Sequence, residues 1–140
     1  MIRIGLGYDL HTLIEDRPLL LGGVHIPFEK GEAGHSDGDV LLHALADSLL
    51  GAACLGDIGE LFPPSWEGAD SRMLLQTVWQ RIRAEGWQLE NADCVIAIQK
   101  PKILPYREAI RRSIAEILSV GTDQVFVKAK TGEGVGVIGS

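Results

Sequence analysis

Residues 33–50 read AGHSDGDVLLHALADSLL and combine a stripe of leucines with a cluster of ionisable groups. The leucines recur at the three- and four-residue spacing of an amphipathic helix, so the stretch predicts a helix over about residues 38–52. The stripe that would face the core consists of Leu41, Leu42, Leu45 and Leu49. Ionisable groups beside such a core need a partner or a chemical role, because burying them alone is costly.

The polar side of this predicted helix carries a histidine between two carboxylates. His43 lies off the leucine stripe, with Asp39 and Asp47 four residues away on either side, where either could orient the imidazole. A solvated helix face explains these two aspartates equally well. Ser36 or Asp37 is expected to cap the helix, and Ser36 with Asp39 three residues later resembles a capping box.

The length and charge of the whole chain limit its class. A chain of 140 residues is expected to form one domain, and a formal net charge of −6 argues against a nucleic-acid partner. Apolar runs stay well short of the roughly 20 residues that a membrane span needs. Cys54 and Cys94 lie 40 residues apart, so we expect two buried thiols in a reducing cytoplasm.

Alternation, helical spacing and glycine positions predict the remaining elements. Loops are expected at residues 29–38 and 56–64. Strands are expected at residues 2–8, 17–28 (with a hairpin about Gly22-Gly23), 91–99 and 124–130, and further helices at 71–86 and 105–118. The order β, β, α, α, β, α, β favours an α+β two-layer sandwich, a mixed sheet with three helices on one face.

Asp9 and His11 follow the first predicted strand and lie two residues apart, so on an extended chain they point the same way. Together with His43 they offer two imidazoles and one carboxylate, a set that suits Zn²⁺ with its fourth position open. The spacing alone is also compatible with ordinary surface or hydrogen-bonded residues.

Three further segments carry polar groups suited to phosphate. His35 and Ser36 lie at the N-terminus of the predicted helix, where N–H groups and the helix dipole favour anions. The loop at residues 57–59 and the strand end at residues 130–133 are the other candidates. The second offers a cation, a hydroxyl and a carboxylate, although each composition is also common in plain turns.

Taken together, these segments resemble the 2-C-methyl-D-erythritol 2,4-cyclodiphosphate synthase family of the non-mevalonate (MEP) isoprenoid pathway. The resemblance spans essentially the whole chain, in the order of the family. It is carried by GYDLH (7–11), LLLGGVHIPFEKG (19–31), AGHSDGDVLLHALADSLLGAACLGDIGELFP (33–63), GADSR (68–72), QKPKILP (99–105) and VKAKTGEGVG (127–136).

The resemblance implies a cytoplasmic bacterial enzyme that is a metal-dependent, cyclising phosphorus-oxygen lyase. Its substrate would be 4-diphosphocytidyl-2-C-methyl-D-erythritol 2-phosphate, whose 2-phosphate attacks its own β-phosphate. The products would be 2-C-methyl-D-erythritol 2,4-cyclodiphosphate and CMP. Such a reaction asks an enzyme mainly for positioning and for neutralisation of phosphate charge.

The same resemblance assigns roles to individual residues. Asp9, His11 and His43 would hold Zn²⁺, and Glu133 would hold a second ion, Mg²⁺ or Mn²⁺. The catalytic residues that would stabilise the transition state are His35 and Thr131. The substrate-binding residues would be Asp9, His11, His35, Ser36, Asp57, Ile58, Gly59, Phe62, Ile98, Lys102, Leu104, Lys130, Thr131 and Glu133.

The resemblance also implies a homotrimer with each active site between adjacent subunits. The chain departs from the family in a short loop after Pro63, and in Lys130 where the family commonly has threonine. The family usually continues beyond the position of Ser140 with a basic turn and an apolar strand. We therefore expect residues 1–140 to form a single domain that lacks this strand.

Two other functions remain open from the sequence. The same zinc ligands could serve a phosphohydrolase that activates water, although the chain offers no obvious general base for it. Alternatively, the protein could be an inactive, metal-binding trimeric scaffold. Analysis of the reaction products would separate the three functions.

Overall fold

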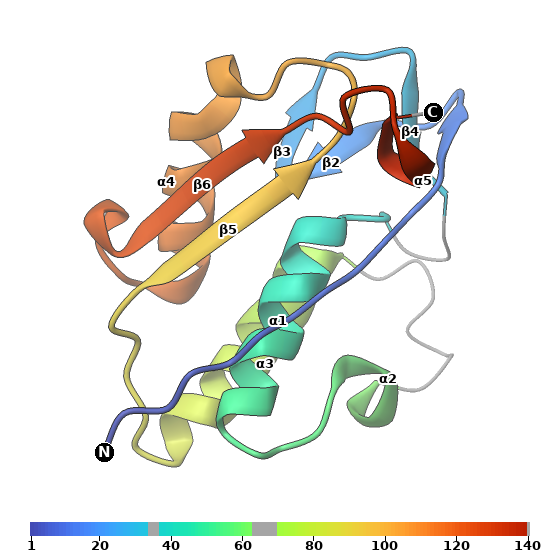
Figure 1. Cartoon of the computed structure of the whole chain (residues 1–140). Helices are drawn as coiled ribbons and strands as arrows, with labels where there is room; N and C mark the ends of the chain where they lie inside the picture. The colour runs from blue at the N-terminus through green and yellow to red at the C-terminus, as the bar shows by residue number, and fades with distance from the viewer. Residues whose placement is uncertain (34–36, 63–69, 140) are drawn as a thin grey trace. The chain divides into compact units, whose positions relative to one another are not determined.

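The structure of the protein, a computed structural model, describes residues 1–33, 37–62 and 70–139 (Figure 1). The chain divides into two compact units, Met1–Gln88 and Leu89–Ser140, each of which combines helices with paired strands. The predicted α+β class is therefore confirmed. A single domain over residues 1–140 stays a prediction, and the predicted roles of His35 and Ser36 fall outside the described residues.

In the first unit, a tight hairpin is tied to the start of the first long helix. Strands β2 (Leu19–Leu21) and β3 (Val24–Ile26) pair antiparallel around Gly22 and Gly23, whose φ angles of 64° and 80° suit a two-residue turn. The carboxylate of Asp39 accepts the N–H groups of Gly22 at 3.0 Å and Gly23 at 2.7 Å. The predicted hairpin is confirmed, with a helix cap as its anchor.

A second, shorter strand pair differs from the sequence prediction. Strand β1 (Leu13–Glu15) pairs antiparallel with β4 (Lys30–Glu32), and Leu13 lies opposite Glu32. The prediction of a loop over residues 29–38 is therefore wrong at its beginning. A three-residue strand is too short for its alternation to be visible in sequence.

Helix α1 (Val40–Ala52) has Asp39 as its N-cap, because the Asp39 carboxylate accepts the N–H of Leu42 at 3.1 Å. The expected cap at Ser36 or Asp37 is thus wrong; the Asp37 carboxylate accepts the N–H of Asp39 instead. The predicted apolar stripe is buried in full.

Helices α2 (Ile58–Leu61) and α3 (Ser71–Ala84) complete the first unit. The α2 turn replaces part of the loop predicted at residues 56–64, because Asp57 caps it through the N–H of Glu60 at 2.8 Å. Asp70 caps α3, and α1 and α3 lie side by side (Figure 1). The apolar face of α3 is buried: Leu74, Leu75, Val78, Trp79 and Ile82.

The N-terminal segment, residues 1–12, is not a strand, so the prediction for residues 2–8 is wrong. The segment runs along α1 (Figure 1), and a Cβ at Gly5 or Gly7 would overlap the carbonyl oxygen of Ser48 or Ala44. The two glycines therefore allow a backbone-to-helix approach that no other residue type permits. No described partner strand hydrogen-bonds to the segment, so the alternation of residues 2–8 misled the prediction.

The second unit is built on a parallel strand pair covered by one helix. Strands β5 (Ala92–Ala97) and β6 (Val125–Lys130) pair in parallel, and helix α4 (Arg107–Leu118) packs against β6. Both strands and the helix were predicted. The apolar face of α4 is buried: Ile110, Ile114, Ile117 and Leu118.

Short helical turns connect these elements. The 3₁₀ turns η2 (Leu104–Tyr106) and η3 (Thr122–Gln124) precede α4 and β6, and helix α5 (Gly136–Gly139) follows β6. The described strands pair two by two in three sheets. The single mixed sheet with three helices on one face stays a prediction.

The expectation of two buried thiols holds for only one cysteine. Cys94 is buried, and burial raises the pKa of its thiol to about 11, whereas Cys54 is exposed. None of the helices that the structure describes has the length and apolar character needed to cross a bilayer.

Candidate metal centre

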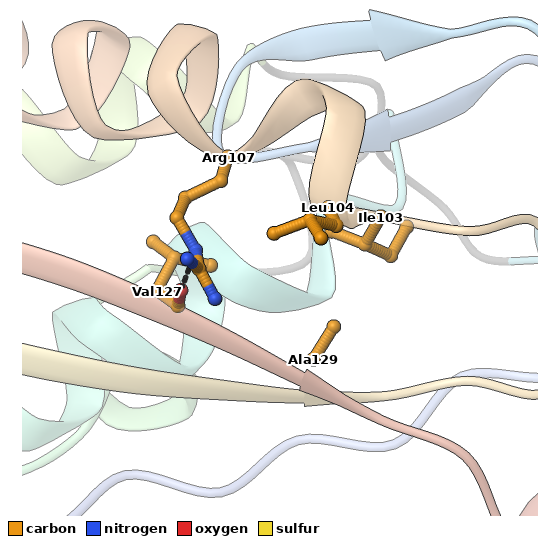
Figure 2. Close-up of a pocket in the computed structure, with 5 residues that line it drawn as sticks. All are labelled: Ile103, Leu104, Arg107, Val127 and Ala129. Atoms are coloured by element: carbon orange, nitrogen blue, oxygen red, sulfur yellow. Dashed lines mark hydrogen bonds between the residues drawn. The ribbon is translucent and has the colours of Figure 1, made fainter.

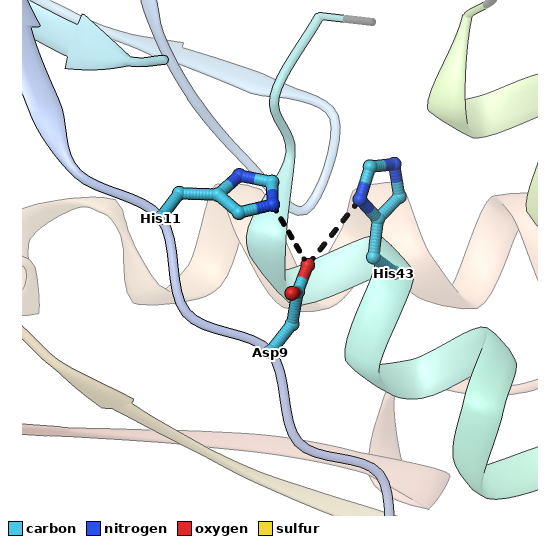
Figure 3. Close-up of side chains that lie close together, drawn as sticks. All are labelled: Asp9, His11 and His43. Carbon is cyan, nitrogen blue, oxygen red and sulfur yellow. Dashed lines mark ion pairs between the residues drawn. The ribbon is translucent and has the colours of Figure 1, made fainter. Parts of the chain in front are cut away.

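Three predicted ligands converge in the first unit (Figure 3). Asp9 Oδ2 lies 3.1 Å from His11 Nε2 and 3.3 Å from His43 Nδ1. One ligand atom from each residue lies within 4.8 Å of the other two. The sequence prediction that these three side chains meet is confirmed.

Two local features of the chain produce this convergence. Asp9 and His11 lie two residues apart on the extended N-terminal segment, so their side chains point to the same side. Gly5 and Gly7 hold this segment against α1, whose first turn carries His43. The glycines of the segment thus set the distance between the pair Asp9 and His11 and the side chain of His43.

The second nitrogen of each imidazole is also engaged. His11 Nδ1 lies 2.8 Å from the carbonyl oxygen of Gly38, and His43 Nε2 lies 2.8 Å from Ser71 Oγ. Because a carbonyl can only accept, Nδ1 of His11 carries the proton and its Nε2 is left for a ligand bond. The two rings are nearly perpendicular, at 72°.

Of the two alternatives left open for Asp39 and Asp47, orientation of His43 is not the one that the structure shows. Asp39 caps α1 and binds the hairpin turn, and Asp47 accepts the N–H of Ile58 at 2.9 Å. Both nitrogens of His43 have other partners. The outer nitrogen of His43 contacts Ser71 instead, a residue that the sequence marks only by its place at the start of a helix.

The charges of the cluster suit a cation. Burial alone would raise the pKa of Asp9, but its hydrogen bonds to His11 and His43 outweigh burial and hold that pKa well below the usual range. The hydrogen bond to Asp9 raises the pKa of His11. A carboxylate that is ionised in the fold, beside two imidazoles with accessible nitrogens, is a donor set that binds divalent transition metals.

The distances also fit zinc. A tetrahedral ion with bonds of about 2.0–2.1 Å to nitrogen and oxygen holds neighbouring donor atoms about 3.3 Å apart. The distances from Asp9 Oδ2 to the two imidazole nitrogens are 3.1 and 3.3 Å. The residues present therefore fit a zinc ion with three protein ligands and one open position.

Two further carboxylates of the first unit, those of Asp39 and Glu32, are buried. Burial raises the pKa of Asp39 to about 6 even though three backbone N–H groups donate to it. Glu32 is 1% exposed, and its Oε2 accepts the N–H of Leu20 at 3.2 Å. Its Oε1 has no hydrogen-bond partner among the described residues. Glu32 is therefore a destabilising group whenever it is ionised.

Glu32→Gln is expected to stabilise the protein at neutral pH. Burial raises the pKa of Glu32 from 4.5 to about 7. The folded state thus holds the proton more tightly than the unfolded chain, so this stabilisation is complete below pH 4.5 and is lost as the pH rises through 7. The shift corresponds to about 3 kcal/mol of unfolding free energy. Urea titrations at several pH values should show the variant gaining this amount over the parent, and a pH-independent difference would contradict it.

Other predicted site residues of the first unit surround α2. Asp57 caps this helix, and Ile58, Gly59 and Phe62 lie within it or at its C-cap. Ile58 is tied to α1 through the carboxylate of Asp47. Their predicted contacts to substrate stay predictions.

The second unit carries the remaining predicted residues. The N–H of Ile98 donates to the carbonyl of Lys130 at 2.9 Å. Thr131 Oγ1 accepts the N–H of Glu133 at 3.2 Å, and the φ of Glu133 is 53°. Thr131 and Glu133 are thus held together in one turn at the end of β6, while their roles stay predictions.

A small pocket in the second unit adds residues that the sequence did not indicate (Figure 2). Its walls are formed by Ile103, Leu104, Arg107, Val127 and Ala129. Arg107 Nε donates to the carbonyl of Val127 at 2.8 Å, which fixes the guanidinium across the pocket wall. Leu104 is one of the predicted site residues, whereas Arg107, Val127 and Ala129 were not predicted.

Comparison with known proteins gives a consistent result. The YgbB family model matches residues 2–140. The 2-C-methyl-D-erythritol 2,4-cyclodiphosphate synthase of Treponema denticola is 62% identical over 141 residues, which cover 99% of this chain and 88% of the relative.

Solved structures agree with the sequence comparison. The bifunctional IspDF of Campylobacter jejuni superposes with a TM-score of 0.96 at 43% identity, over 99% of this chain and 38% of that longer protein. A 2C-methyl-D-erythritol-2,4-cyclodiphosphate synthase in a CDP-bound form gives 0.90 at 42% identity, over 95% of this chain and 91% of the other. The chain therefore belongs to the YgbB family, among the cyclodiphosphate synthases.

Proposed function

We propose that this protein is the enzyme that converts 4-diphosphocytidyl-2-C-methyl-D-erythritol 2-phosphate into 2-C-methyl-D-erythritol 2,4-cyclodiphosphate and CMP. The convergence of Asp9, His11 and His43 is the observation that carries the proposal, together with family membership over residues 2–140. The CDP-bound relative supports a cytidine diphosphate substrate. The enzyme would act in the isoprenoid MEP pathway, in the bacterial cytoplasm.

The chemistry requires two negatively charged phosphates of one molecule to approach each other. Zn²⁺ bound by Asp9, His11 and His43 would supply a Lewis acid and positive charge for the phosphate under attack. Asp9 would remain ionised and so hold a cation beside the substrate, because the pKa of its carboxyl is held low. The attacking 2-phosphate belongs to the substrate, so the protein's task is to position it and to exclude water. We class the reaction as a cyclising phosphorus-oxygen lyase reaction.

The remaining roles follow the family resemblance. His35 and Thr131 would stabilise charge in the transition state, and Ser36 would contact phosphate. Asp57, Ile58, Gly59 and Phe62 would hold the methylerythritol part, and residues 98–104, with Lys130, would hold the cytidine diphosphate. Glu133 would bind Mg²⁺ or Mn²⁺, whose preference for oxygen ligands suits a carboxylate and phosphates.

We further propose a homotrimer with active sites between subunits. The N-terminal segment leaves Ile2, Ile4 and Leu6 79%, 92% and 91% exposed, an apolar row that water solvates poorly. A second subunit that covers this row would remove it from water. Sedimentation equilibrium is expected to give the mass of three chains, and the mass of one chain would contradict the proposal.

Product analysis tests the function directly. The whole protein is incubated with the diphosphocytidyl substrate and Mg²⁺, and the products are followed by phosphorus NMR. The cyclase gives CMP and a cyclic diphosphate, whereas a phosphohydrolase gives linear phosphates and an inactive scaffold gives no product. Either of the last two results would overturn the proposal.

Glu133→Gln is expected to keep zinc bound but to raise the Mg²⁺ or Mn²⁺ concentration needed for half-maximal turnover. The amide keeps the shape of the side chain but removes the charge that attracts the ion. Zinc content and a metal-titration curve of turnover measure the two effects. Glu116→Gln, on an exposed position of α4, is the matched control. Coincident titration curves for Glu133→Gln and the parent would contradict the assignment.

A further inference from the structure

The outer nitrogen of His43 contacts a buried hydroxyl group. Ser71 is the first residue of α3 and is 1% exposed, and its Oγ lies 2.8 Å from His43 Nε2. His43 comes from α1, so this contact joins the two long helices of the first unit. The chemistry of the contact depends on which group supplies the proton, because a hydroxyl can both donate and accept.

Asp37 decides the direction of this hydrogen bond. The hydroxyl of Ser71 donates to Asp37 Oδ1, and Asp37 Oδ2 accepts the backbone N–H of Ser71 at 3.0 Å. Asp37 Oδ1 also accepts the N–H of Asp39 at 3.1 Å, so this carboxylate is surrounded by donors. A hydroxyl has one proton, and here it is given to Asp37. Ser71 Oγ can then only accept, and the N–H must lie on Nε2 of His43.

This proton placement has a direct effect on the metal centre. A neutral imidazole carries one N–H, so a proton on Nε2 leaves the lone pair on Nδ1, the nitrogen 3.3 Å from Asp9 Oδ2. The carbonyl of Gly38 can only accept, so it holds the proton of His11 on Nδ1 and leaves the lone pair on Nε2. The hydroxyl of Ser71 can donate as well as accept. It therefore accepts from His43 only because its own proton is donated to Asp37.

We propose that Ser71 and Asp37 form a relay that positions His43 for metal binding by holding the proton on Nε2. Both are positioning residues: they act through His43 and are not ligands themselves. The proposal rests on the zinc centre of the proposed function, but it concerns two residues that were not predicted as metal- or substrate-binding.

Zinc affinity of the whole purified protein tests the relay. Ser71→Ala removes the acceptor of Nε2–H, and a lost second-layer partner of a ligating histidine typically costs about 10- to 100-fold in metal affinity. Competition with a chromophoric chelator measures that loss. Ser48→Ala is the matched control, since Ser48 Oγ, on α1, donates only to the carbonyl of Leu45 at 2.7 Å. We expect the control to bind zinc as the parent does.

A spectroscopic signature separates positioning from a general structural role. In zinc-loaded protein with ¹⁵N-labelled histidine, the Nε2–H proton of His43 is expected to exchange slowly with water in the parent and fast in Ser71→Ala. The Nδ1–H proton of His11, held by Gly38, should be unchanged in both. Asp37→Ala removes the acceptor of the Ser71 hydroxyl, which can then turn toward His43, so this variant should also lower zinc affinity while Ser71 stays in place.

The outcomes are distinguishable. A parent protein that binds no zinc overturns the metal centre and this proposal with it. A parent that binds zinc while Ser71→Ala binds equally tightly overturns the relay alone. Equal losses in Ser71→Ala and Ser48→Ala, or parallel changes in the His11 and His43 proton signals, would show a general structural effect and also overturn the relay. An affinity loss confined to Ser71→Ala and Asp37→Ala, with the His43 signal alone altered, supports it.

Discussion

His43→Ala loses its zinc on dialysis and shows no turnover, while its circular dichroism remains that of the parent. We expect this result because His43 supplies one of the three donor atoms that converge at the centre among the described residues. The side chain is largely buried but lies off the apolar stripe of α1, so its removal leaves the buried leucines of that stripe in place. Zinc content by atomic emission and CMP release are the two measurements.

The chain offers a matched control for this variant. His25 lies on β3 with its side chain exposed, outside the ligand cluster. His25→Ala should keep both zinc and turnover. Zinc content in His43→Ala that equals that of the parent after dialysis would remove His43 from the ligand set.

Gly7→Ala is the second variant with a large expected effect. A Cβ at this position would overlap the carbonyl oxygen of Ala44 in α1, and a helix backbone cannot yield to it. The N-terminal segment must therefore move away from α1, and it takes Asp9 and His11 away from His43. Misplacing functional groups by 1 Å can cost about 100-fold. We expect a loss of at least that size in zinc affinity, measured by chelator competition.

Gly51→Ala is the control for this variant. Gly51 lies in α1, and a Cβ there meets no atom within 4 Å, so the same substitution is sterically free. Alanine in a helix is favoured over glycine by about 1 kcal/mol, so this variant should keep its zinc and unfold at a slightly higher temperature. Unchanged zinc affinity in Gly7→Ala would contradict the role given to the close approach.

The metal ligands were predictable because both halves of the set obey simple periodicities. Asp9 and His11 share a side of an extended chain, and His43 lies off the leucine stripe of a helix. The partner of His43 was not predictable in this way. Ser71 reaches His43 only because α1 and α3 pack together, and a contact between elements 28 residues apart leaves no periodic trace. Local spacing favoured Asp39 and Asp47, which the fold uses elsewhere.

The secondary structure was likewise predictable only in part. Helices α1, α3 and α4 were predicted, and the buried stripe of α1 with them, because apolar spacing over several turns is a strong signal. The pairing of β1 with β4 was missed, since three residues are too few to show alternation. Residues 2–8 alternate between apolar and other residues, yet they form no strand. Alternation shows that an extended segment has two different faces, but it does not show that another strand is there to pair with it.

The alternation of side chains along the N-terminal segment limits which insertions and deletions the protein tolerates there. Odd-numbered residues Gly5, Gly7, Asp9 and His11 serve the helix and the metal centre, while even-numbered residues carry the exposed apolar row. Inserting or deleting one codon between Gly7 and Asp9 would shift every later residue of the segment by one position. Asp9 and His11 would then point to solvent instead of toward His43. Substitutions on the even positions are tolerable one at a time, but length changes here are acceptable only in pairs.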